Sequence, residues 1–290
     1  MSDPCLTFTN LTLGYAGRAA VHHLDGDITK GSLTAVVGAN GSGKSTLMKG
    51  IAGILKPLGG ECRISAGISV AYLPQQSELD RSFPAQVRDL VALGLWPRRG
   101  LLGRHRSEDK AAMGRVMEAV GLSGFEKRNI DSLSGGQMQR ALFARAMLQD
   151  AQLILLDEPF NAVDERTVTD LLVLIKAWVA EGRTVLAVLH DHQLVRQHFP
   201  QTLFLARRLV GLGPTADVLK PENMRQARHF HEAWAENAPW CAPGDAPRNN
   251  APVTNAPVTN APATDALDAG ARAASSHSHI HSHANSNAHG

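Results

Sequence analysis

Residues Gly38–Thr46 read GANGSGKST, and this stretch decides the fold. It fits the pattern Gly-x-x-x-x-Gly-Lys-Ser, in which glycines let successive backbone N–H groups turn inward around an anion. Lys44 adds a mobile positive charge for the β- and γ-phosphates, and Ser45 offers a hydroxyl to Mg²⁺. A buried strand is predicted before the stretch and a helix after it, which is the context for phosphate binding. The predicted triphosphate site comprises Gly38, Ala39, Asn40, Gly41, Ser42, Gly43, Lys44, Ser45 and Thr46.

Length, composition and charge narrow the class of protein. The chain has 290 residues, 43% of them hydrophobic, which is enough for a sizeable core in one or two domains. The formal net charge is only +2, so the composition does not favour nucleic acid as a partner. Three widely spaced cysteines, Cys5, Cys62 and Cys241, indicate a reducing compartment rather than a disulfide framework.

The chain carries no sequence pattern of a membrane span or a leader. No apolar run approaches the roughly 20 residues needed to cross a bilayer. The N-terminal residues MSDPCLTFTN lack the basic-then-apolar pattern of a secretory signal. We therefore expect a cytosolic protein whose membrane role passes through a partner.

Two predicted strands end in side chains that suit catalysis. LILLDEP (Leu153–Pro159) is an apolar strand that ends in Asp157 and Glu158, and its apolar run predicts a buried parallel strand with a ligand-facing carboxyl end. A purely structural role for two such carboxylates is disfavoured, because burying unpaired charge is expensive. TVLAVLH (Thr184–His190) is predicted to lie beside this strand, which brings His190 to the same site.

A second candidate phosphate site lies at Leu133–Arg140, which reads LSGGQMQR. Ser134 can cap the helix predicted over Asp131–Asp150. Gly135 and Gly136 are costly inside a helix, but in the first turn they leave backbone N–H groups bare for an anion.

Other polar residues stand at predicted element ends. Gln75 and Gln76 directly follow a short strand within Ile68–Leu73, where the edge of a sheet meets ligands. Asp164 is predicted to cap a helix over Glu165–Ala180.

The rest of the chain supplies a predicted frame. A β-ribbon with a polar turn near Asn10 is expected over Leu6–Tyr15, where Tyr15 either stacks on an adenine ring or is simply half-buried. Strands are expected within Val21–Ile28 and over Leu33–Gly38, and a hairpin over Thr202–Gly213. Helices are expected over Ser45–Leu55, over Pro84–Leu95 with its proline in the first turn, from a cap at Ser107 to about Val120, and over Asn223–Trp234. A turn is expected over Lys56–Glu61 and a solvated loop over Arg98–Arg106.

The composition changes beyond residue 236. Asn250–Thr264 reads NAPVTNAPVTNAPAT, a repeat that cannot bury enough apolar surface to order itself. We expect one folded unit over residues 1–236 and a disordered, low-complexity tail over 237–290. The hypothetical zinc ligands of this tail are His277, His279, His281 and His283. A tail without a metal role, or an artificial remnant, is the open alternative.

Five elements occur in one order: GANGSGKST, Gln75, LSGGQMQR, LILLDEP and His190. Together they resemble the ATP-binding subunit of an ABC transporter over roughly the first 235 residues, and LSGGQ makes the resemblance highly specific. The resemblance implies an α/β fold. Its parts are a P-loop NTPase (RecA-like) core, an N-terminal antiparallel β-subdomain and an inserted α-helical subdomain at about residues 76–150.

The resemblance also implies a role for each motif residue. The implied ligands are ATP and Mg²⁺. Tyr15 would stack on the adenine, Gly38–Thr46 with Lys44 among them would bind the phosphates, and Ser45 and Asp157 would bind Mg²⁺. Gln75 would contact Mg²⁺ and the attacking water, Glu158 would act as the general base, and the switch residue His190 would contact the γ-phosphate.

Other implied roles require a second copy of the chain. Ser134, Gly135, Gly136 and Gln137 resemble the segment that caps the γ-phosphate in the opposite subunit, and Asp164 matches an aspartate of the loop that crosses the dimer interface. Asn161 departs from the more common serine or threonine of that loop, and we assign it no contact. ATP binding would then close the dimer and hydrolysis would release it. The implied partners are a second copy, an integral membrane permease and, indirectly, a substrate-binding protein. The implied location is the inner face of the plasma membrane.

A narrower resemblance concerns the cargo. Tyr72–Trp96 reads YLPQQSELDRSFPAQVRDLVALGLW and is similar to a stretch that faces the permease in the ATPases of zinc and manganese importers. The histidine-rich tail favours zinc, because imidazole is a good zinc ligand and manganese prefers oxygen. We therefore predict ATP hydrolysis coupled to uptake of a divalent transition metal, with zinc first and manganese or another metal chelate as the alternative.

Two other classes of protein compete with this interpretation. A soluble ABC ATPase for DNA repair would need long coiled coils between its motifs, and a translation factor would need two ATPase domains. Lys44 and Ser134 are too close in sequence for the first, and the chain has one motif set. A zinc-buffering protein would not need Asp157, Glu158 and His190.

Overall fold

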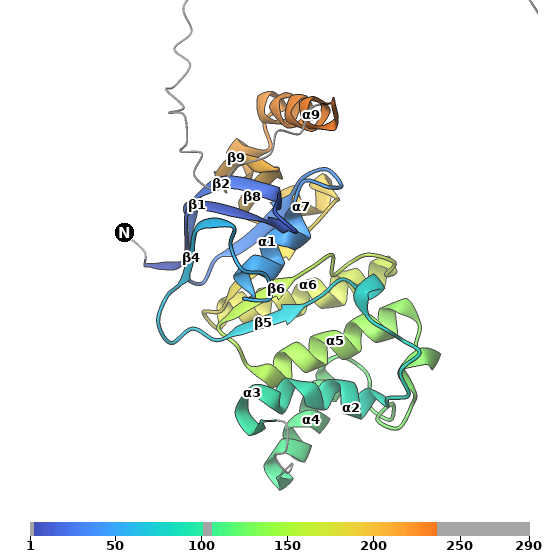
Figure 1. Cartoon of the computed structure of the whole chain (residues 1–290). Helices are drawn as coiled ribbons and strands as arrows, with labels where there is room; N and C mark the ends of the chain where they lie inside the picture. The colour runs from blue at the N-terminus through green and yellow to red at the C-terminus, as the bar shows by residue number, and fades with distance from the viewer. Residues whose placement is uncertain (1–2, 101–105, 237–290) are drawn as a thin grey trace, which may run out of the picture. The chain divides into compact units, whose positions relative to one another are not determined.

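A computed structural model describes residues 3–100 and 106–236, and its central element is a six-stranded sheet (Figure 1). The strand order is β5-β6-β7-β3-β8-β9, with β9 antiparallel to β8 and the other neighbours parallel. Every residue of β3, β6 and β7 is buried, as their uninterrupted apolar sequences predict. The strands are β5 (Val70–Leu73), β6 (Leu153–Leu156), β7 (Thr184–Val188), β3 (Leu33–Val37), β8 (Gln201–Ala206) and β9 (Arg208–Pro214).

An antiparallel sheet of order β2-β1-β4 forms the second layer. Its strands are β1 (Pro4–Tyr15), β2 (Arg18–Thr29) and β4 (Gly59–Ile64). Helix α1 (Lys44–Ile51) packs between the two sheets, where Leu47 and Met48 share one core with Leu11 and Val36. The α/β fold with its N-terminal antiparallel sheet is therefore confirmed.

A backbone contact also joins the two sheets at the P-loop (Gly38–Thr46). The N–H of Arg207, in the turn between β8 and β9, donates to Ser42 O at 3.0 Å. The carbonyl of the same residue accepts from the N–H of His22 in β2 at 2.7 Å. Arg207 has a φ of 59°, a left-handed conformation that lets one residue make both bonds.

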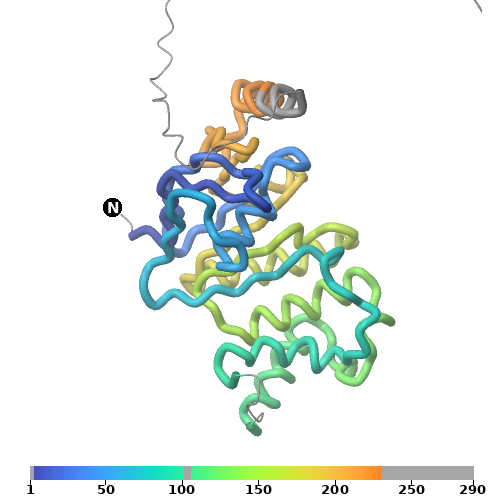
Figure 2. The backbone as a smooth tube through the Cα atoms, in the orientation of Figure 1, coloured from blue at the N-terminus to red at the C-terminus, as the bar shows by residue number. Residues whose placement is uncertain are grey.

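Helices gather on one side of the parallel sheet (Figure 2). Helix α5 (Gly135–Gln149) contacts both α2 (Val87–Ala92) and α4 (Ser107–Ala119), and all three contribute to one apolar core. These helices fall within the predicted insertion at about 76–150, whose limits as a subdomain remain a prediction. The other α-helices in the described ranges are α3 (Trp96–Arg99), α6 (Glu165–Ala180), α7 (His192–His198), α8 (Thr215–Val218) and α9 (Pro221–Glu236).

Several local predictions are wrong. No turn interrupts β1 at Asn10, which instead forms a bulge with a φ of 48° because asparagine tolerates the left-handed region. Gly59–Glu61, expected in a turn, belongs to β4. Pro84 lies before α2, whose N-cap is Gln86. Ser107 is the first residue of α4 rather than its cap, and Asp109 accepts from the N–H of Arg106.

The other predicted elements are present with small shifts at their ends. Helix α1 ends at Ile51 instead of Leu55, and Gly53 follows it with a φ of 72°. Part of the expected loop over Arg98–Arg106 is helical, since α3 runs to Arg99. Of the helices in the described ranges, none combines the length and the apolar character that a membrane span requires. The predicted tail, residues 237–290, lies outside the described residues.

Candidate functional site

The P-loop wraps tightly around the amine of Lys44. Its Nζ donates to the carbonyl oxygens of Gly38 and Ala39, each at 2.9 Å. Gly38 has a φ of 156°, and a Cβ on it would overlap Leu205 O. Burial lowers the pKa of Lys44, although the carboxylates of Glu158 and Asp157 oppose that shift. The amine of Lys44 thus lies within the loop, and its predicted contact with phosphate stays a prediction.

Asp157 follows β6 and is almost completely buried, with 2% of its surface exposed. Its Oδ1 accepts from Ser45 Oγ at 3.2 Å, and its Oδ2 accepts from Tyr72 OH at 3.4 Å. Burial raises the pKa of Asp157, the hydrogen bond from Ser45 lowers it, and the neighbouring Glu158 raises it again. A buried carboxylate beside a hydroxyl supplies the oxygen ligands that Mg²⁺ prefers, so these residues fit the ion. The sequence reasoning missed Tyr72, which reaches Asp157 because β5 and β6 are neighbours in the sheet.

Three side chains hold the carboxylate of Glu158. Oε2 accepts from Gln75 Nε2 at 2.6 Å and from Asn161 Nδ2 at 3.1 Å, while Oε1 lies 2.7 Å from His190 Nε2. Glu158 has a φ of 50°, a strained backbone conformation typical of functional sites. The parallel pairing of β6 with β7 brings His190 alongside, as predicted. From the sequence, Asn161 is assigned no contact, whereas its amide reaches Glu158, three residues earlier in the chain.

An open cavity of about 800 Å³ surrounds this cluster. Gln75, Glu158, His190 and Asn40 line it, so one space joins the P-loop to the carboxylate. A smaller hollow of about 410 Å³ lies beside it, between the P-loop and residues Met224 and Ala227 of α9. Three of the residues predicted as catalytic, Gln75, Glu158 and His190, are therefore brought together. Lys44 is buried within the P-loop and does not line this cavity.

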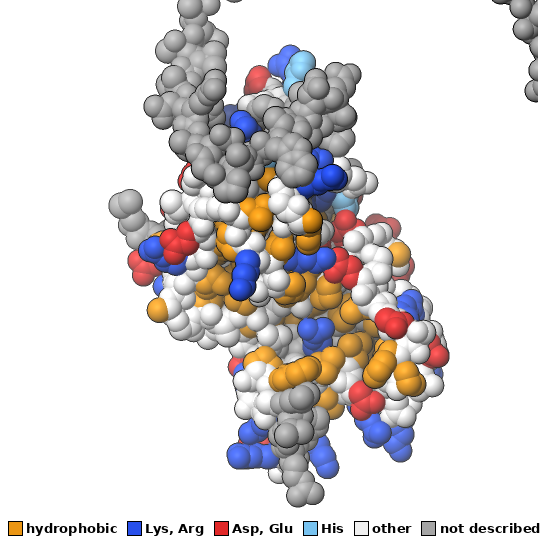
Figure 3. All heavy atoms as spheres, in the orientation of Figure 1, with side chains coloured by type: hydrophobic (Ala, Val, Ile, Leu, Met, Phe, Trp, Pro, Cys, Tyr) orange, Lys and Arg blue, Asp and Glu red, His pale blue; other side chains and the backbone are white. Residues whose placement is uncertain are grey.

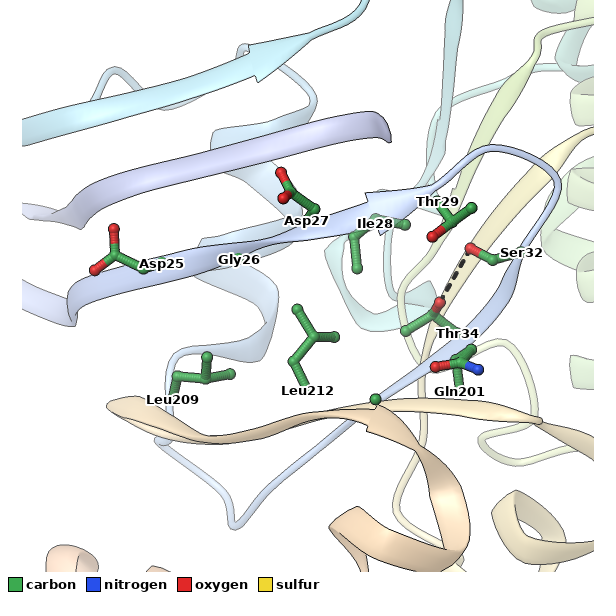
Figure 4. Close-up of a pocket in the computed structure, with 11 residues that line it drawn as sticks. Asp25, Gly26, Asp27, Ile28, Thr29, Ser32, Thr34, Gln201, Leu209 and Leu212 are labelled. Carbon is green, nitrogen blue, oxygen red and sulfur yellow. Dashed lines mark hydrogen bonds between the residues drawn. The ribbon is translucent and has the colours of Figure 1, made fainter. Parts of the chain in front are cut away.

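Another hollow, of about 430 Å³, lies near the amino ends of β3 and β8 (Figure 4). Asp25 and Asp27 extend from β2 at its rim, and Leu209 and Leu212 come from β9. Ser32 Oγ and Thr34 Oγ1 lie 3.4 Å apart within it. Its carboxylates would repel a phosphate, so this hollow does not compete with the P-loop as the triphosphate site.

The LSGGQ segment (Leu133–Gln137) begins α5. As predicted, Ser134 caps this helix: its Oγ accepts from Gln137 N at 3.2 Å, and its own N–H donates to Gln137 Oε1 at 3.1 Å. Ser134 is exposed, and the segment lines neither of the hollows beside the P-loop. Within one copy of the chain, the two predicted phosphate sites are therefore separate.

Two more predicted ligand residues lie outside those hollows. Asp164 caps α6, accepting from the N–H and the hydroxyl of Thr167 at 2.9 Å and 2.8 Å. Tyr15 ends β1 with 51% of its surface exposed. Their predicted contacts with nucleotide remain predictions. The histidines His277, His279, His281 and His283 lie outside the described residues. Within those residues, no group of three or more His, Cys, Asp or Glu side chains is placed to hold a metal ion.

An apolar groove of about 370 Å³ marks the helical side of the molecule. Leu79, Phe83, Leu90, Leu93 and Met138 line it, with Asp80, Arg81 and Asp89 among them. Phe83 is 65% exposed, and Trp96, one helical turn beyond Leu93, is 50% exposed. Hydrophobic side chains gather on this face (Figure 3). Exposed large apolar groups in a groove are typical of a surface that binds another protein.

This chain is similar to known proteins in sequence and in fold. The family model described as ABC transporter matches residues 21–161, from β2 to just beyond Glu158. A zinc transport system ATP-binding protein of Treponema pallidum is 38% identical over 224 residues, which are 75% of this chain and 84% of the relative. A manganese transport system ATP-binding protein of Listeria monocytogenes is 36% identical over 223 residues, 75% of this chain and 93% of the relative.

A solved structure agrees with these relatives. It is a metal-chelate type ABC transporter in an inward-facing conformation, and it has a TM-score of 0.70 and 30% identity to this chain. The match covers 78% of this chain and 90% of the solved one.

Proposed function

This chain belongs to the ABC transporter family as an ATP-hydrolysing subunit of a metal transport system, and on that premise we propose that it powers uptake of a divalent transition metal, zinc first. The observation that carries the proposal is the Glu158 carboxylate, held by Gln75, Asn161 and His190 at the wall of a cavity that the P-loop also lines. Phosphoryl transfer needs this combination of positioned carboxylate and charge neutralisation more than covalent help.

Each residue has a distinct task in the proposed reaction. The P-loop N–H groups and Lys44 bind the phosphates and offset their negative charge. Ser45 and Asp157 would hold Mg²⁺, which when bound would supply positive charge against the negative charge of the phosphates. Glu158 accepts a hydrogen bond from the attacking water and orients it toward the γ-phosphate. Gln75 and His190 hold the carboxylate of Glu158 in place. In the proposed reaction Gln75 also contacts the attacking water, and His190 contacts the γ-phosphate.

We propose that two copies complete the site. The capped and exposed start of α5 presents Ser134, Gly135 and Gly136 to a second copy, where bare N–H groups at a helix N-terminus suit a γ-phosphate. ATP would then lie between the P-loop of one copy and the LSGGQ segment of the other. Asp164 and Tyr15 are assigned their nucleotide contacts within that dimer.

The permease is proposed to bind in the apolar groove. An apolar segment of the permease would cover Phe83 and Leu93, with Asp80 and Asp89 offering polar contacts at the rim. This contact would keep the chain on the inner face of the membrane. Phe83→Ser should leave the ATPase activity of the free subunit unchanged and reduce its binding to permease-containing vesicles. Equal binding of both proteins would contradict this assignment.

Zinc is the proposed cargo, with manganese as the alternative. The zinc relative from Treponema pallidum supports the first and the manganese relative from Listeria supports the second, while the histidines of the tail favour zinc by their ligand chemistry. We further propose that His277, His279, His281 and His283 bind zinc as a buffer or sensor. Zinc titration of the full chain and of a variant ending at residue 236 should reveal a site only in the full chain. Equal binding by both would exclude the tail.

The decisive experiment for the proposed function measures metal uptake by cells. In cells lacking this chain, accumulation of zinc, manganese and iron is measured side by side after complementation with the wild type or with Glu158→Gln. The wild type should restore zinc uptake and the variant should not, although it still binds ATP and forms a stable dimer. Restoration of manganese alone would establish the alternative. Restored uptake by Glu158→Gln would refute its proposed role.

A further inference from the structure

The segment that follows β5, residues 75–81, ties three parts of the molecule together. Gln75 donates to the carboxylate of Glu158 at 2.6 Å. Glu78 forms an ion pair of 2.7 Å with Lys49 of α1, the helix that follows the P-loop. Arg81 donates to the carbonyl of Leu133, the residue before the cap of α5. The segment thus contacts the carboxylate, the phosphate-loop helix and the LSGGQ segment within a few residues.

Gln76 makes the most specific of these contacts. Its Nε2 donates one hydrogen to Gly135 O at 3.1 Å and the other to Gln139 Oε1 at 2.7 Å. Gly135 and Gln139 are four residues apart, so they lie on the same face of α5. The side-chain amide nitrogen of Gln76 is therefore hydrogen-bonded twice to the first turns of α5, the helix that carries the LSGGQ segment.

The burial of Gln139 makes this contact costly to lose. Gln139 is 3% exposed, so its oxygen cannot turn to water if Gln76 is removed. A buried acceptor left unpaired destabilises the folded state, whereas replacing both partners by apolar groups is nearly neutral. The position of Gln76 relative to α5 is therefore determined by hydrogen bonding and burial together.

We propose that Gln76 is a positioning residue for the LSGGQ segment. Gln75 and Gln76 are adjacent, and the first contacts Glu158 while the second contacts the start of α5. A movement of Gln75 would therefore be transmitted to the first turn of α5 through the adjacent Gln76. The role in the dimer rests on the proposed function, since that turn is there assigned to the second copy's γ-phosphate.

The first test uses the monomer without nucleotide. Hydrogen exchange is measured at the amides of Gln137–Gln139 in the wild type and in Gln76→Leu, where exchange should accelerate several-fold. Gln149→Leu is the matched control, because Gln149 Nε2 donates to Val70 O at 2.8 Å from the other end of α5. The control should lower stability without changing exchange at Gln137–Gln139. Unchanged exchange in Gln76→Leu would overturn the proposal.

A double variant separates positioning from stability. Gln76→Leu/Gln139→Leu removes the buried acceptor and should regain the melting temperature of the wild type. Exchange at Gln137 and Met138 should stay fast, because the bond to Gly135 O is still missing. Full recovery of slow exchange would mean that Gln76 only satisfies Gln139, and would overturn the inference.

The second test measures the dimer. In a Glu158→Gln background, the ATP concentration for half-maximal dimerisation should rise about tenfold or more with Gln76→Leu, because both hydrogen bonds that hold the first turn of α5 are lost in each copy. ATP binding to the monomer should not change. An unchanged midpoint would contradict the positioning role. A Glu158→Gln parent that never dimerises would instead refute the proposed dimer, and the exchange experiment still decides the role of Gln76.

Discussion

The side-chain amide of Asn161 donates a hydrogen bond of 3.1 Å to Oε2 of Glu158, the carboxylate assigned to water activation. Replacing Asn161 with Ala removes one of three groups that hold this carboxylate. We expect kcat for ATP hydrolysis to fall roughly 3–10-fold, the effect of one hydrogen bond to a positioned group. ATP affinity should stay unchanged, because Asn161 does not belong to the P-loop. Steady-state kinetics with a fluorescent nucleotide-binding assay checks both values.

Asn161→Asp serves as the sharper comparison. It keeps the shape of the side chain but places a second carboxylate against Glu158, so like charges replace a hydrogen bond. The loss of kcat should therefore exceed that of Asn161→Ala. If the two variants have equal activity, the amide does not hold Glu158 during turnover.

Asp157 should destabilise the protein in the absence of ligand. The carboxylate is 2% exposed, and burial raises its pKa. Asp157→Asn removes the buried charge and should raise the free energy of unfolding by roughly 1–2 kcal/mol, or Tm by about 2–8 °C. The same variant should lose ATPase activity with Mg²⁺. Calorimetry of both proteins without nucleotide measures the difference, and a lower Tm for the variant would contradict it.

The stability difference should depend on pH with a defined sign. Because the pKa of Asp157 is raised in the folded state, the folded protein binds this proton more tightly than the unfolded chain. The cost of the charge is present at neutral pH and shrinks as the pH falls through the raised folded-state pKa. It disappears only below the unfolded pKa of about 4, where the carboxyl is protonated in both states. The gain from Asp157→Asn should accordingly shrink between pH 7 and pH 4. A difference that grows toward acid would contradict the shift.

The hydroxyl of Tyr72 should affect the Mg²⁺ dependence of ATP hydrolysis rather than the affinity for ATP. Tyr72→Phe deletes only the hydroxyl that lies 3.4 Å from Asp157 Oδ2. This long hydrogen bond helps to orient the proposed metal ligand, so the Mg²⁺ concentration for half-maximal activity should rise about 2–5-fold. Nucleotide binding without Mg²⁺ should not change. A Mg²⁺ titration identical to that of the wild type would exclude the role.

Gly38 and Gly41 form a matched pair in the P-loop. A Cβ on Gly38 would overlap Leu205 O, whereas a Cβ on Gly41 meets nothing within 4 Å. Gly38→Ala should therefore abolish ATP binding or folding. Gly41→Ala, with a φ of 77°, should cost only the left-handed backbone strain of about 1–2 kcal/mol. Circular dichroism and ATP affinity compare the two, and equal effects would contradict the packing argument.

The local sequence was sufficient to predict features that depend only on neighbouring residues, such as two of the helix caps and the buried strands. Ser134 and Asp164 were predicted as helix caps and are caps, because a side-chain oxygen before a helical pattern has few other partners. The buried parallel strands ending at Asp157 and near His190 were likewise readable from uninterrupted apolar runs. The neighbouring order of these strands then placed His190 beside Glu158.

Contacts between distant segments could not be predicted in the same way. The bonds of Gln76 to Gly135 and Gln139 join residues about 60 positions apart, and no local pattern encodes them. Asn161 was dismissed because it departs from a family pattern, although its distance from Glu158 follows from the turn that the chain makes after β6. Asn10 was read as a turn because asparagine favours both turns and bulges, and only the pairing of β1 with β2 separates the two.

The backbone of Arg207 has a consequence for how the protein melts. Because this residue joins Ser42 of the P-loop to His22 of β2, separating the antiparallel sheet from the folded loop breaks backbone hydrogen bonds on both sides of Arg207. The two layers should consequently lose structure in one all-or-none transition, with equal calorimetric and van't Hoff enthalpies. Nucleotide bound to the loop would then protect residues as far away as β1 from thermal unfolding.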